Sequence, residues 1–417
     1  MRSLAGKHFI KNIINAAADT VSFFIPRSKK RVICGGWSGD RFCDNSKAMF
    51  LYLNENKESL GIERVTWQTR NGDLYRQLKR DGFDVQMVNS LPAVLASARS
   101  KYHIVDVCGG DIQRIFSGGA VRVNLWHGIP LKRFGRLCGY EDGDIAGAII
   151  DNLKQAELGH WNYFYILTTS GELGATNQQA FGVDEGHCVP GPYPRMAYLR
   201  GDIKHYLLDE ETQCAEKLSR LRASGKRAVC YLPTFRDSSS MNEVTVDAVK
   251  QLTDWAKENN AFIITKMHHA STGKIDSDSE LLVNIPSQGD VYNFLDGADV
   301  LISDYSSVVF DFMFLGRPIV FYCFDRDYYE NSDRGFNLDY EKFTPGDKAE
   351  DIQALFESLK KAVDSPEEYA ESYADRTKQV LDYIGQAGKY EITAKDVGDF
   401  WSRIESKKKT EKVKRNS

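Results

Sequence analysis

The sequence predicts an α/β protein made of two doubly wound domains, each with helices on both faces of a largely parallel sheet. The chain has 417 residues, which is long enough for two such domains. Short apolar runs alternate with helical segments in two series, the pattern of repeated strand–helix units. A Pro- and Gly-punctuated segment, GPYPRMAYLRGD at 191–202, separates the two series and is typical of a connection between domains.

The two series define the expected elements. In the first series, strands are predicted at residues 31–36, 65–67, 85–88, 102–107, 122–126, 163–168 and 188–189, with helices at 46–54 and 73–81. In the second series, strands are predicted at 228–232, 261–266, 281–284, 300–303 and 319–324, with helices at 208–224, 243–258, 290–296, 349–363 and 366–383. The predicted organisation is therefore an N-terminal segment at 1–30, domains at 31–200 and 201–400, and a basic tail at 401–417.

The stretch from Asp299 to Asn337 predicts an anion-binding edge in the second domain. An apolar run at 300–302 ends in a polar turn, and Ser306 and Ser307 stand where a helix begins. Free backbone amides and the helix dipole favour a phosphate at such a position. We therefore expect this edge of the sheet to hold a phosphorylated ligand.

Four predicted strands end directly at basic or hydroxyl-bearing residues. These residues are His127, then Thr234 and Arg236, then His268 and His269, and finally Ser306 and Ser307. In an open parallel sheet the carboxyl ends of the strands line one crevice, so these groups are expected to converge there. Such a set suits a reaction at a phosphate, because the charge that develops on a leaving phosphate must be neutralised.

Each of these residues also has a structural explanation. A histidine at a strand end is more often structural than catalytic, and Arg236 with Asp237 would serve as a surface ion pair. Ser306 and Ser307 would serve as helix caps. His127 is the strongest candidate, because a tight Gly- and Pro-containing turn follows it directly and further cations lie just beyond.

The formal net charge of -4 is unevenly distributed. Residues 1–31 carry seven Lys or Arg against one Asp, and residues 401–417 carry seven against two Glu. An acidic body with basic ends does not fit a nucleic-acid binder, which needs a basic face on its folded domain. It fits an anionic membrane surface better, although charged tails are often simply solvated.

The segment 1–30 is predicted to form an amphipathic helix that lies in a membrane interface. Apolar residues recur at helical spacing from Phe9 to Val21, polar residues lie opposite them, and a basic cluster follows at 27–31. An ordinary helix packed on the body is the alternative. The chain contains no uncharged apolar run long enough to span a membrane, and a secretory signal is not expected.

Cysteine spacing and known motifs argue against a zinc enzyme, an NTPase or a dinucleotide enzyme. The eight cysteines form no CxxC pair and are expected to be small buried residues of a reducing compartment. GxxxxGK[ST], GxGxxG and HExxH do not occur. Asp325-Arg326-Asp327 resembles a DxD metal clamp, but such short acidic patterns are common by chance, so no metal is predicted.

Several segments together resemble the CDP-glycerol glycerophosphotransferase family, the primases and polymerases of wall teichoic acids and related capsular polymers. The segments are GGWSGDRFCDNSKAMFLYL near the N-terminus, NLWHGIPLKRFG at 124–135, YLPTFRD at 231–237, ITKMHH at 264–269, GPYPRMAYL in the connection and the whole block at 299–346. The resemblance covers nearly all of residues 31–385. It implies a two-domain fold of the GT-B type with the domains facing across a cleft, peripheral attachment to the cytoplasmic membrane face, and transfer of a polyol phosphate from a CDP-polyol without a cofactor.

The resemblance also implies roles for individual residues. His127 matches the general base for the acceptor hydroxyl, and His268 matches a catalytic contact to the donor diphosphate. Arg236, Ser306 and Ser307 match contacts to the donor phosphates.

Further residues follow from the same motifs. Asp311 is expected near the cytidine ribose, Arg334 near the donor charge and Thr234 among the substrate-binding residues. The sequence departs from the family pattern at His269, where the family usually has Pro. This difference affects the expected position of His268.

Three functions follow from these observations. The first is transfer of glycerol phosphate, or a related polyol phosphate, from CDP-glycerol to a hydroxyl of a lipid-linked saccharide or growing polymer, with release of CMP. The second is a GT-B glycosyltransferase that uses a nucleotide sugar for cell-surface polysaccharide synthesis. The third is a non-catalytic nucleotide-binding scaffold at the membrane, which the retained His and Arg residues argue against.

Overall fold

The computed structural model describes most of the chain. The described residues are 24–107, 109–138, 164–234, 236, 239–267, 279–332, 335–385 and 391–414, together with Ala18, Val21 and Ser22. Most of the predicted N-terminal helix at 1–30 lies outside them and stays a prediction. In the described part of the chain, no helix has both the length and the apolar character needed to cross a membrane.

The described residues form two compact units. Unit 1 comprises the residues up to His127, those at 164–204 and those from Ile392 onward, and unit 2 comprises residues 128–138 and 205–391. The break after Lys204 lies close to the predicted boundary at 200. Two ranges differ from the predicted domains, because the segment just after His127 belongs to unit 2 and the C-terminal residues belong to unit 1.

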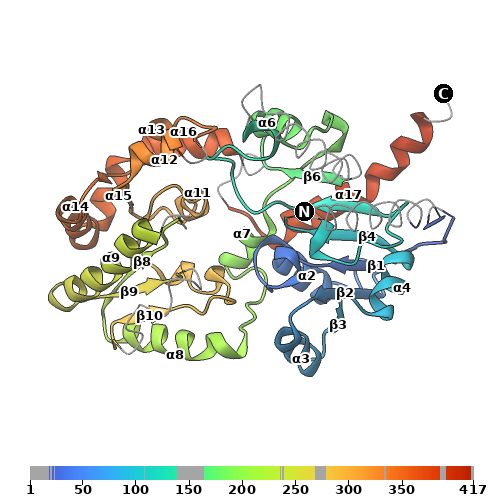
Figure 1. Cartoon of the computed structure of the whole chain (residues 1–417), viewed down its shortest axis with the longest axis horizontal. Helices are drawn as coiled ribbons and strands as arrows, with labels where there is room; N and C mark the ends of the chain where they lie inside the picture. The colour runs from blue at the N-terminus through green and yellow to red at the C-terminus, as the bar shows by residue number, and fades with distance from the viewer. Residues whose placement is uncertain are drawn as a thin grey trace, which may run out of the picture. The chain divides into compact units, whose positions relative to one another are not determined.

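Unit 1 is built, within its described residues, on a seven-stranded sheet in the order β3-β2-β1-β4-β5-β6-β7 (Figure 1). Its strands are β1 (Ser28–Cys34), β2 (Arg64–Thr69), β3 (Asp84–Met87), β4 (Ser100–Val105), β5 (Val121–Asn124), β6 (Phe164–Thr168) and β7 (Cys188–Pro190). Every neighbouring pair is parallel. The end of β1, Val32 to Cys34, is fully buried, as expected for a central strand covered on both faces.

Three of the described helices of unit 1 begin at a residue whose side chain caps the helix, and two others do not show such a cap. The described helices of this unit are α2 (Asp44–Glu55), α3 (Gly72–Arg80), α4 (Leu91–Arg99), α6 (Gly171–Phe181), α7 (Pro194–Leu199) and α17 (Ala394–Lys414). The side chains of Asn71, Ser90 and Ser170 accept hydrogen bonds from the first turns of α3, α4 and α6. Helix α6 ends at Gly182, whose φ of 64° is the left-handed conformation that glycine adopts readily.

Unit 2 is built, within its described residues, on a six-stranded parallel sheet in the order β10-β9-β8-β11-β12-β13. Its strands are β8 (Arg227–Tyr231), β9 (Ala261–Thr265), β10 (Leu282–Asn284), β11 (Val300–Ser303), β12 (Ile319–Tyr322) and β13 (Lys348–Ala349). Its helices are α8 (Asp209–Ala223), α9 (Ser239–Glu258), α11 (Val308–Met313), α12 (Arg326–Ser332), α13 (Tyr340–Phe343), α14 (Ile352–Asp364), α15 (Pro366–Ser372) and α16 (Ala374–Ile384). Leu252 of α9 and Leu359 of α14 pack in one apolar core with Ile263 and Val320 of the sheet.

Each sheet has one point where its strand order reverses. In unit 1 this point lies between β1 and β4, and in unit 2 it lies between β8 and β11. The loops that leave neighbouring strands at such a point diverge to opposite sides, which opens a crevice at the carboxyl ends of the strands. The predicted fold of two doubly wound parallel sheets is thus observed, and each sheet offers one preferred position for a site.

Several elements differ from those predicted. The predicted helix at 290–296 consists of two short 3-10 turns, Val291–Asn293 and Leu295–Gly297, and the predicted helix at 366–383 is divided into α15 and α16. Strand β13 was not predicted, because two residues carry too little periodicity to identify a strand.

The C-terminal helix corrects the expectation of a basic tail at 401–417. Helix α17 runs through Lys414, and Phe400, Trp401 and Ile404 are buried against unit 1. The indole of Trp401 lies edge-on to Tyr102 of β4, with ring centroids 4.9 Å apart. Phe400 packs against Gly191, where even a Cβ atom would lie 2.2 Å from the ring. The segment from Trp401 to Ile404 is therefore a packed part of helix α17 rather than the start of a basic tail.

We predict that Trp401→Ala lowers the free energy of unfolding of unit 1 by about 3–5 kcal/mol, because it removes a fully buried indole and leaves a cavity. Chemical denaturation followed by circular dichroism measures this change. Ser402→Ala, on the exposed side of the same helix, is the matched control and should change stability by at most about 0.5 kcal/mol. Equal stability of both variants would show that α17 does not pack as described.

Candidate functional site

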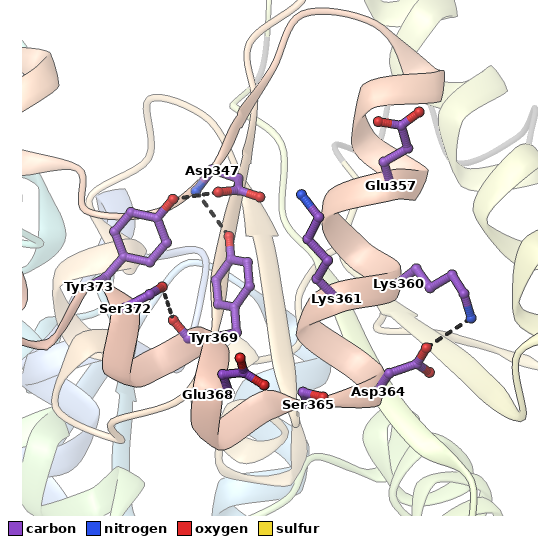
Figure 2. A pocket seen from close by; sticks show the side chains of 10 residues that line it. All are labelled: Asp347, Glu357, Lys360, Lys361, Asp364, Ser365, Glu368, Tyr369, Ser372 and Tyr373. Carbon is purple, nitrogen blue, oxygen red and sulfur yellow. Dashed lines mark hydrogen bonds and ion pairs between the residues drawn. The ribbon is translucent and has the colours of Figure 1, made fainter.

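Unit 2 contains a pocket whose lining includes none of the predicted site residues (Figure 2). Its volume is about 700 Å³, and it is lined by residues of α14, α15 and the loops next to them. The lining contains four carboxylates, those of Asp347, Glu357, Asp364 and Glu368, against two lysines. An acidic lining does not suit a phosphorylated ligand, so this pocket is not the candidate site.

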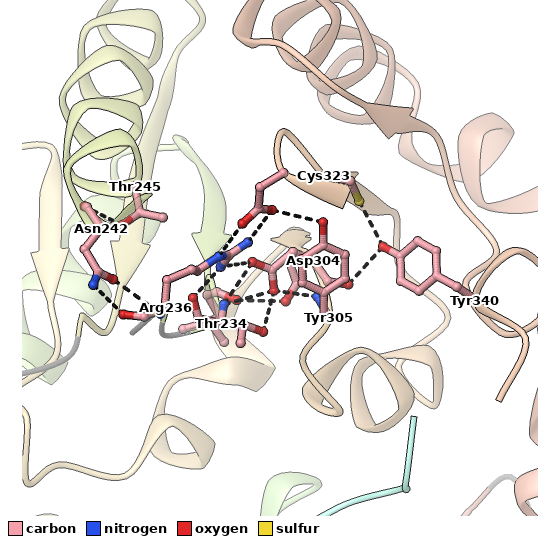
Figure 3. A network of polar contacts seen from close by, with 11 residues as sticks. Thr234, Arg236, Asn242, Thr245, Asp304, Tyr305, Cys323 and Tyr340 are labelled. Carbon is pink, nitrogen blue, oxygen red and sulfur yellow. Dashed lines mark hydrogen bonds and ion pairs between the residues drawn. The ribbon is translucent and has the colours of Figure 1, made fainter. Parts of the chain in front are cut away.

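The candidate site of unit 2 lies instead at the carboxyl ends of β8, β11 and β12 (Figure 3). Thr234 and Arg236 follow β8, Asp304 and Tyr305 follow β11, and Asp325 follows β12. The parallel register places these three strand ends at one edge of the sheet, at the point where the strand order reverses. The predicted residues Thr234 and Arg236 are therefore brought together with the turn that carries Ser306 and Ser307.

Arg236 forms a buried triad with Asp304 and Asp325. Its Nε and Nη2 donate to the two carboxylate oxygens of Asp325 at 2.9 and 3.0 Å, and its Nη1 donates to Asp304 at 2.5 Å. Nη1 also donates to the carbonyl oxygen of Thr234. The side chain of Arg236 is only 2% exposed. Burial by itself would lower the pKa of the Arg236 guanidinium. The two nearby carboxylates have the larger combined effect, so the pKa is raised.

Asp304 joins the loop after β8 to the turn after β11. Its carboxylate accepts hydrogen bonds from the backbone N–H of Thr234 at 2.9 Å and from the Thr234 hydroxyl at 2.7 Å. It also accepts from the backbone N–H of Tyr305 at 2.5 Å. One carboxylate thus fixes both loops that border the crevice of unit 2.

Aromatic side chains enclose the triad. The Tyr305 hydroxyl donates to Asp325 at 3.0 Å, and its ring stacks on Tyr329 with centroids 4.0 Å apart. Burial, followed by nearby negative groups, raises the pKa of Tyr305. The Tyr340 hydroxyl donates to the backbone oxygen of Asp304 at 3.1 Å and lies 2.9 Å from the thiol of Cys323. The triad is therefore shielded from water by rings whose polar ends take part in the same network.

This arrangement differs from the expectation that Arg236 presents its charge to a phosphate. Four of the five guanidinium N–H groups are already engaged by protein acceptors, because burying the charge requires paired carboxylates. The triad as a whole carries a formal charge of -1. In the structure, Arg236 holds loops in place rather than offering a free cation.

The serine turn is where the sequence predicted it. Ser306 and Ser307 precede α11 and are both half-exposed, while the neighbouring residues on each side are buried. The Ser306 hydroxyl accepts a weak hydrogen bond from the Val308 N–H at 3.4 Å. Ser306 and Ser307 are thus the predicted site residues that are partly exposed at this strand end.

Asp311 lies differently from the expectation of a ribose contact. It is fully buried on α11, and its carboxylate accepts a hydrogen bond from the Tyr292 hydroxyl at 2.5 Å. The carboxylate therefore ties α11 to the 3-10 turn at Val291–Asn293, because the first turn of this short helix faces the core.

Three predicted residues lie outside the described part of the chain, namely His268, His269 and Arg334. Their expected roles stay predictions. Of the two carboxylates in the DxD-like pattern, Asp325 is buried against Arg236 and Asp327 is exposed.

His127 follows β5 at the carboxyl edge of the unit 1 sheet. It is half-buried between two indoles, with its ring centroid 4.1 Å from Trp126 and 5.5 Å from Trp37. Asn45 donates to the backbone oxygen of Trp126 at 2.8 Å, and Arg195 donates to the backbone oxygen of His127 at 2.9 Å. The histidine is therefore held by its neighbours on both sides.

Backbone strain is concentrated around His127. Trp37, Ser38, Asp44 and Trp126 all have positive φ, at 47°, 60°, 68° and 57°. Non-glycine residues avoid this region, and such strain persists where surrounding contacts impose it, often at functional sites. The loop after β1 and the residue before His127 thus share the features of an organised site.

The residues that surround His127 are not among those that the strand-end pattern predicts. Asp44, Asn45 and Arg195 lie in GGWSGDRFCDNSKAMFLYL and GPYPRMAYL, two segments that carried a resemblance but no assigned role. The signal available in the sequence was a run of four polar residues, DNSK, at the start of a predicted helix that is otherwise apolar.

Comparison with known proteins places the chain in a family. Residues 17–388 match the family described as CDP-glycerol:poly(glycerophosphate) glycerophosphotransferase. A teichoic acid glycerol-phosphate transferase of Staphylococcus aureus is 26% identical over 384 residues, which cover 88% of this chain and 93% of the relative. A teichoic acid poly(glycerol phosphate) polymerase of Bacillus spizizenii is 27% identical over 350 residues, which cover 81% and 84% of the two chains.

A solved structure shares the fold. The wall teichoic acid polymerase TagF matches with a TM-score of 0.71 and 19% identity, covering 98% of this chain and 99% of that chain. This likeness confirms the predicted fold class of two α/β domains with parallel sheets. Because the family match spans most of the sequence, the chain belongs to the CDP-glycerol:poly(glycerophosphate) glycerophosphotransferase family and is an enzyme of that class.

Proposed function

We propose that this enzyme transfers glycerol phosphate, or a related polyol phosphate, from a CDP-polyol to a hydroxyl of a lipid-linked saccharide or growing polymer, releasing CMP. The observation that carries the proposal is the pair of partly exposed serine residues at the strand-order reversal of unit 2, in a turn held by a buried Arg–Asp network. The names of the relatives support it, because they include both glycerol-phosphate and ribitol-phosphate enzymes. A TagF variant soaked with CDPG supports the choice of donor.

In this proposal unit 2 binds the donor. Ser306 and Ser307 donate hydrogen bonds to the diphosphate, and Thr234 borders the same crevice. Arg236 acts as a positioning residue that fixes the two loops through Asp304. Because the triad carries a net negative charge, the positive charge that a diphosphate needs comes from other groups, for which His268 and Arg334 are the candidates from the sequence. The reaction uses no metal or other cofactor in this scheme.

In this proposal His127 of unit 1 acts as the general base. Its imidazole takes the proton of the acceptor hydroxyl, and the acceptor oxygen attacks the β-phosphorus of the CDP-polyol. A new P–O bond forms, the bond from the β-phosphorus to the bridging oxygen breaks, and CMP leaves with that oxygen and the electron pair. An imidazole suits this step because its ordinary pKa lies near neutral pH.

The proposed acceptor also suggests where the enzyme works. A lipid-linked acceptor lies at a membrane, and the basic ends of the chain suit an anionic lipid surface. We place the enzyme at the cytoplasmic face of the membrane, attached peripherally.

The test of the proposed function is a donor panel. The purified protein is incubated with CDP-glycerol, CDP-ribitol or nucleotide sugars over lipid-linked saccharide acceptors, and nucleotide release and product mass are measured. We expect CMP release that depends on the acceptor, with products that grow by polyol phosphate units. Release of UDP or GDP would instead support a glycosyltransferase, and binding of CDP-glycerol without turnover would support a scaffold.

We predict that His127→Ala folds normally and lowers the rate of CMP release by at least about 100-fold, since general-base catalysis typically contributes that much. His187→Ala is the matched control, because His187 is another histidine of unit 1, paired with Asp184 on the surface. A His127→Ala enzyme with a near wild-type rate would remove His127 as the base.

We predict that Arg236→Met lowers the free energy of unfolding by about 3–5 kcal/mol, because two buried carboxylates lose their cation. The same change should weaken CDP-glycerol binding, since the loops that carry Thr234 and Ser306 lose their anchor. Arg64→Met, which breaks an exposed pair with Asp84, should cost at most about 1 kcal/mol. Unchanged stability and affinity in Arg236→Met would contradict the positioning role.

A further inference from the structure

The first turn of α2 in unit 1 is made of four buried polar residues. Asp44 is 6% exposed, and Asn45, Ser46 and Lys47 are 0% exposed. Burying polar and charged groups is costly unless each finds a partner, and apolar residues would fill the same space at lower cost. Packing alone therefore does not explain why these four buried residues are polar.

Two side chains connect this turn to the peptide groups next to His127. Asn45 Nδ2 donates to the Trp126 carbonyl at 2.8 Å, on the N-terminal side of the histidine. Arg195 Nη1 donates to the His127 carbonyl at 2.9 Å, on its C-terminal side. Asn45 Oδ1 also accepts from the backbone N–H of Arg195 at 3.2 Å, so the two donors are linked to each other. The backbone on both sides of His127 is thus clamped.

Asp44 fixes the direction of the Arg195 guanidinium. The two side chains form an ion pair at 2.6 Å, with Arg195 1% exposed and Asp44 7% exposed. The other oxygen of Asp44 accepts from the indole N–H of Trp37 at 3.3 Å. The ring of Trp37 lies beside the His127 imidazole. The Asp44 carboxylate therefore orients both Arg195, which donates to the His127 carbonyl, and Trp37, which contacts the imidazole.

The rest of the turn anchors the clamp to the sheet and to α7. The carboxylate of Asp106, after β4, accepts from the Ser46 N–H at 2.8 Å and from its hydroxyl at 2.5 Å. Burial, followed by the charge of Asp44, raises the pKa of Asp106 well above its usual range. The ammonium of Lys47 lies 4.7 Å from the ring centre of Tyr198 in α7, the helix that carries Arg195.

We propose that Arg195 and Asn45 are positioning residues for the transfer reaction, which hold the His127 imidazole in place by clamping the carbonyls on both sides of it. Asp44 makes this possible by pairing with the buried Arg195. The strained φ of 57° at Trp126 supports the proposal, because an unclamped chain would relax to an unstrained conformation and turn the following imidazole. The inference rests on the proposed role of His127 as the base.

The experiment compares Arg195→Met and Asn45→Ala with wild type. We expect kcat to fall by roughly 10- to 100-fold, because a base displaced by about 1 Å loses that much rate. The KM and the equilibrium Kd for CDP-glycerol should stay within about twofold, because the donor is proposed to bind unit 2. Asn45→Asp, which keeps the acceptor for the Arg195 N–H but loses the donor to Trp126, should also lower kcat.

The control is Arg27→Met, in the same unit. Arg27 donates to the carbonyls of Ser97, Ser100, Phe116 and Gly118, none of which belongs to the peptide groups on either side of His127. This variant should lose stability while keeping the wild-type kcat at temperatures where it remains folded. If Arg195→Met and Arg27→Met behave alike, with stability lost and kcat unchanged, Arg195 is merely structural and the inference is overturned.

Combination with His127→Ala separates this inference from the proposed function. If Arg195 acts through His127, adding Arg195→Met to His127→Ala should change the residual rate by less than about twofold. An equal fold-loss in both backgrounds would show that Arg195 acts independently and would overturn the inference alone. A near wild-type rate in His127→Ala would overturn the base assignment itself. Should Arg195→Met fail to fold, Asn45→Ala decides the matter, because it leaves the Arg195–Asp44 pair intact.

Discussion

A buried ion pair between an arginine and a carboxylate stands at the carboxyl edge of each parallel sheet, and the organisation of both candidate sites depends on it. In unit 1 Arg195 pairs with Asp44, and in unit 2 Arg236 pairs with Asp304 and Asp325. Each arginine is at most 2% exposed and also donates to a backbone carbonyl, that of His127 or of Thr234. The two sites thus use the same device, in which a planar guanidinium joins loops that leave different strands.

Such buried ion pairs fix the orientation of the loops more than they stabilise the folded protein. Desolvation of the ions offsets most of their attraction, so a well-packed apolar cluster would stabilise the loops at least as well. An apolar cluster would not fix the direction of individual carbonyls and N–H groups, however, whereas a guanidinium fork and a carboxylate each accept few orientations. In unit 2 the ion pair fixes the Thr234 N–H and the turn before Ser306 through hydrogen bonds to Asp304. In unit 1 it fixes the peptide group that follows His127 through the hydrogen bond from Arg195.

The sequence predicted the sheets well and the sites in part. Period-2 and apolar runs identify buried strands, and the rule for parallel sheets then places His127, Thr234 and the Ser306 turn at strand ends. The sequence pattern does not show whether a strand-end cation faces solvent or the core. Arg236 faces inward because it pairs with two buried carboxylates. These partners lie 68 and 89 residues away in the sequence, so the pairing leaves no local signal. The sequence gives no local signal for the pair of Arg195 and Asp44 either, because these residues are 151 positions apart.

The charges of these buried ion pairs show that they position the loops but do not supply positive charge to a bound diphosphate. The Arg195–Asp44 pair is formally neutral and the Arg236 triad is formally negative, so neither adds positive charge to a bound diphosphate. A departing CMP nevertheless needs donors and positive charge where its own negative charge develops. Those groups must therefore be others, for which the partly exposed Ser306 and Ser307 are candidates among the described residues. His268 and Arg334 stay candidates from the sequence alone. It follows that substitutions at the two buried arginines are expected to act by displacing the groups that touch substrate, whereas substitution of a cation that itself contacts the diphosphate would act by removing charge.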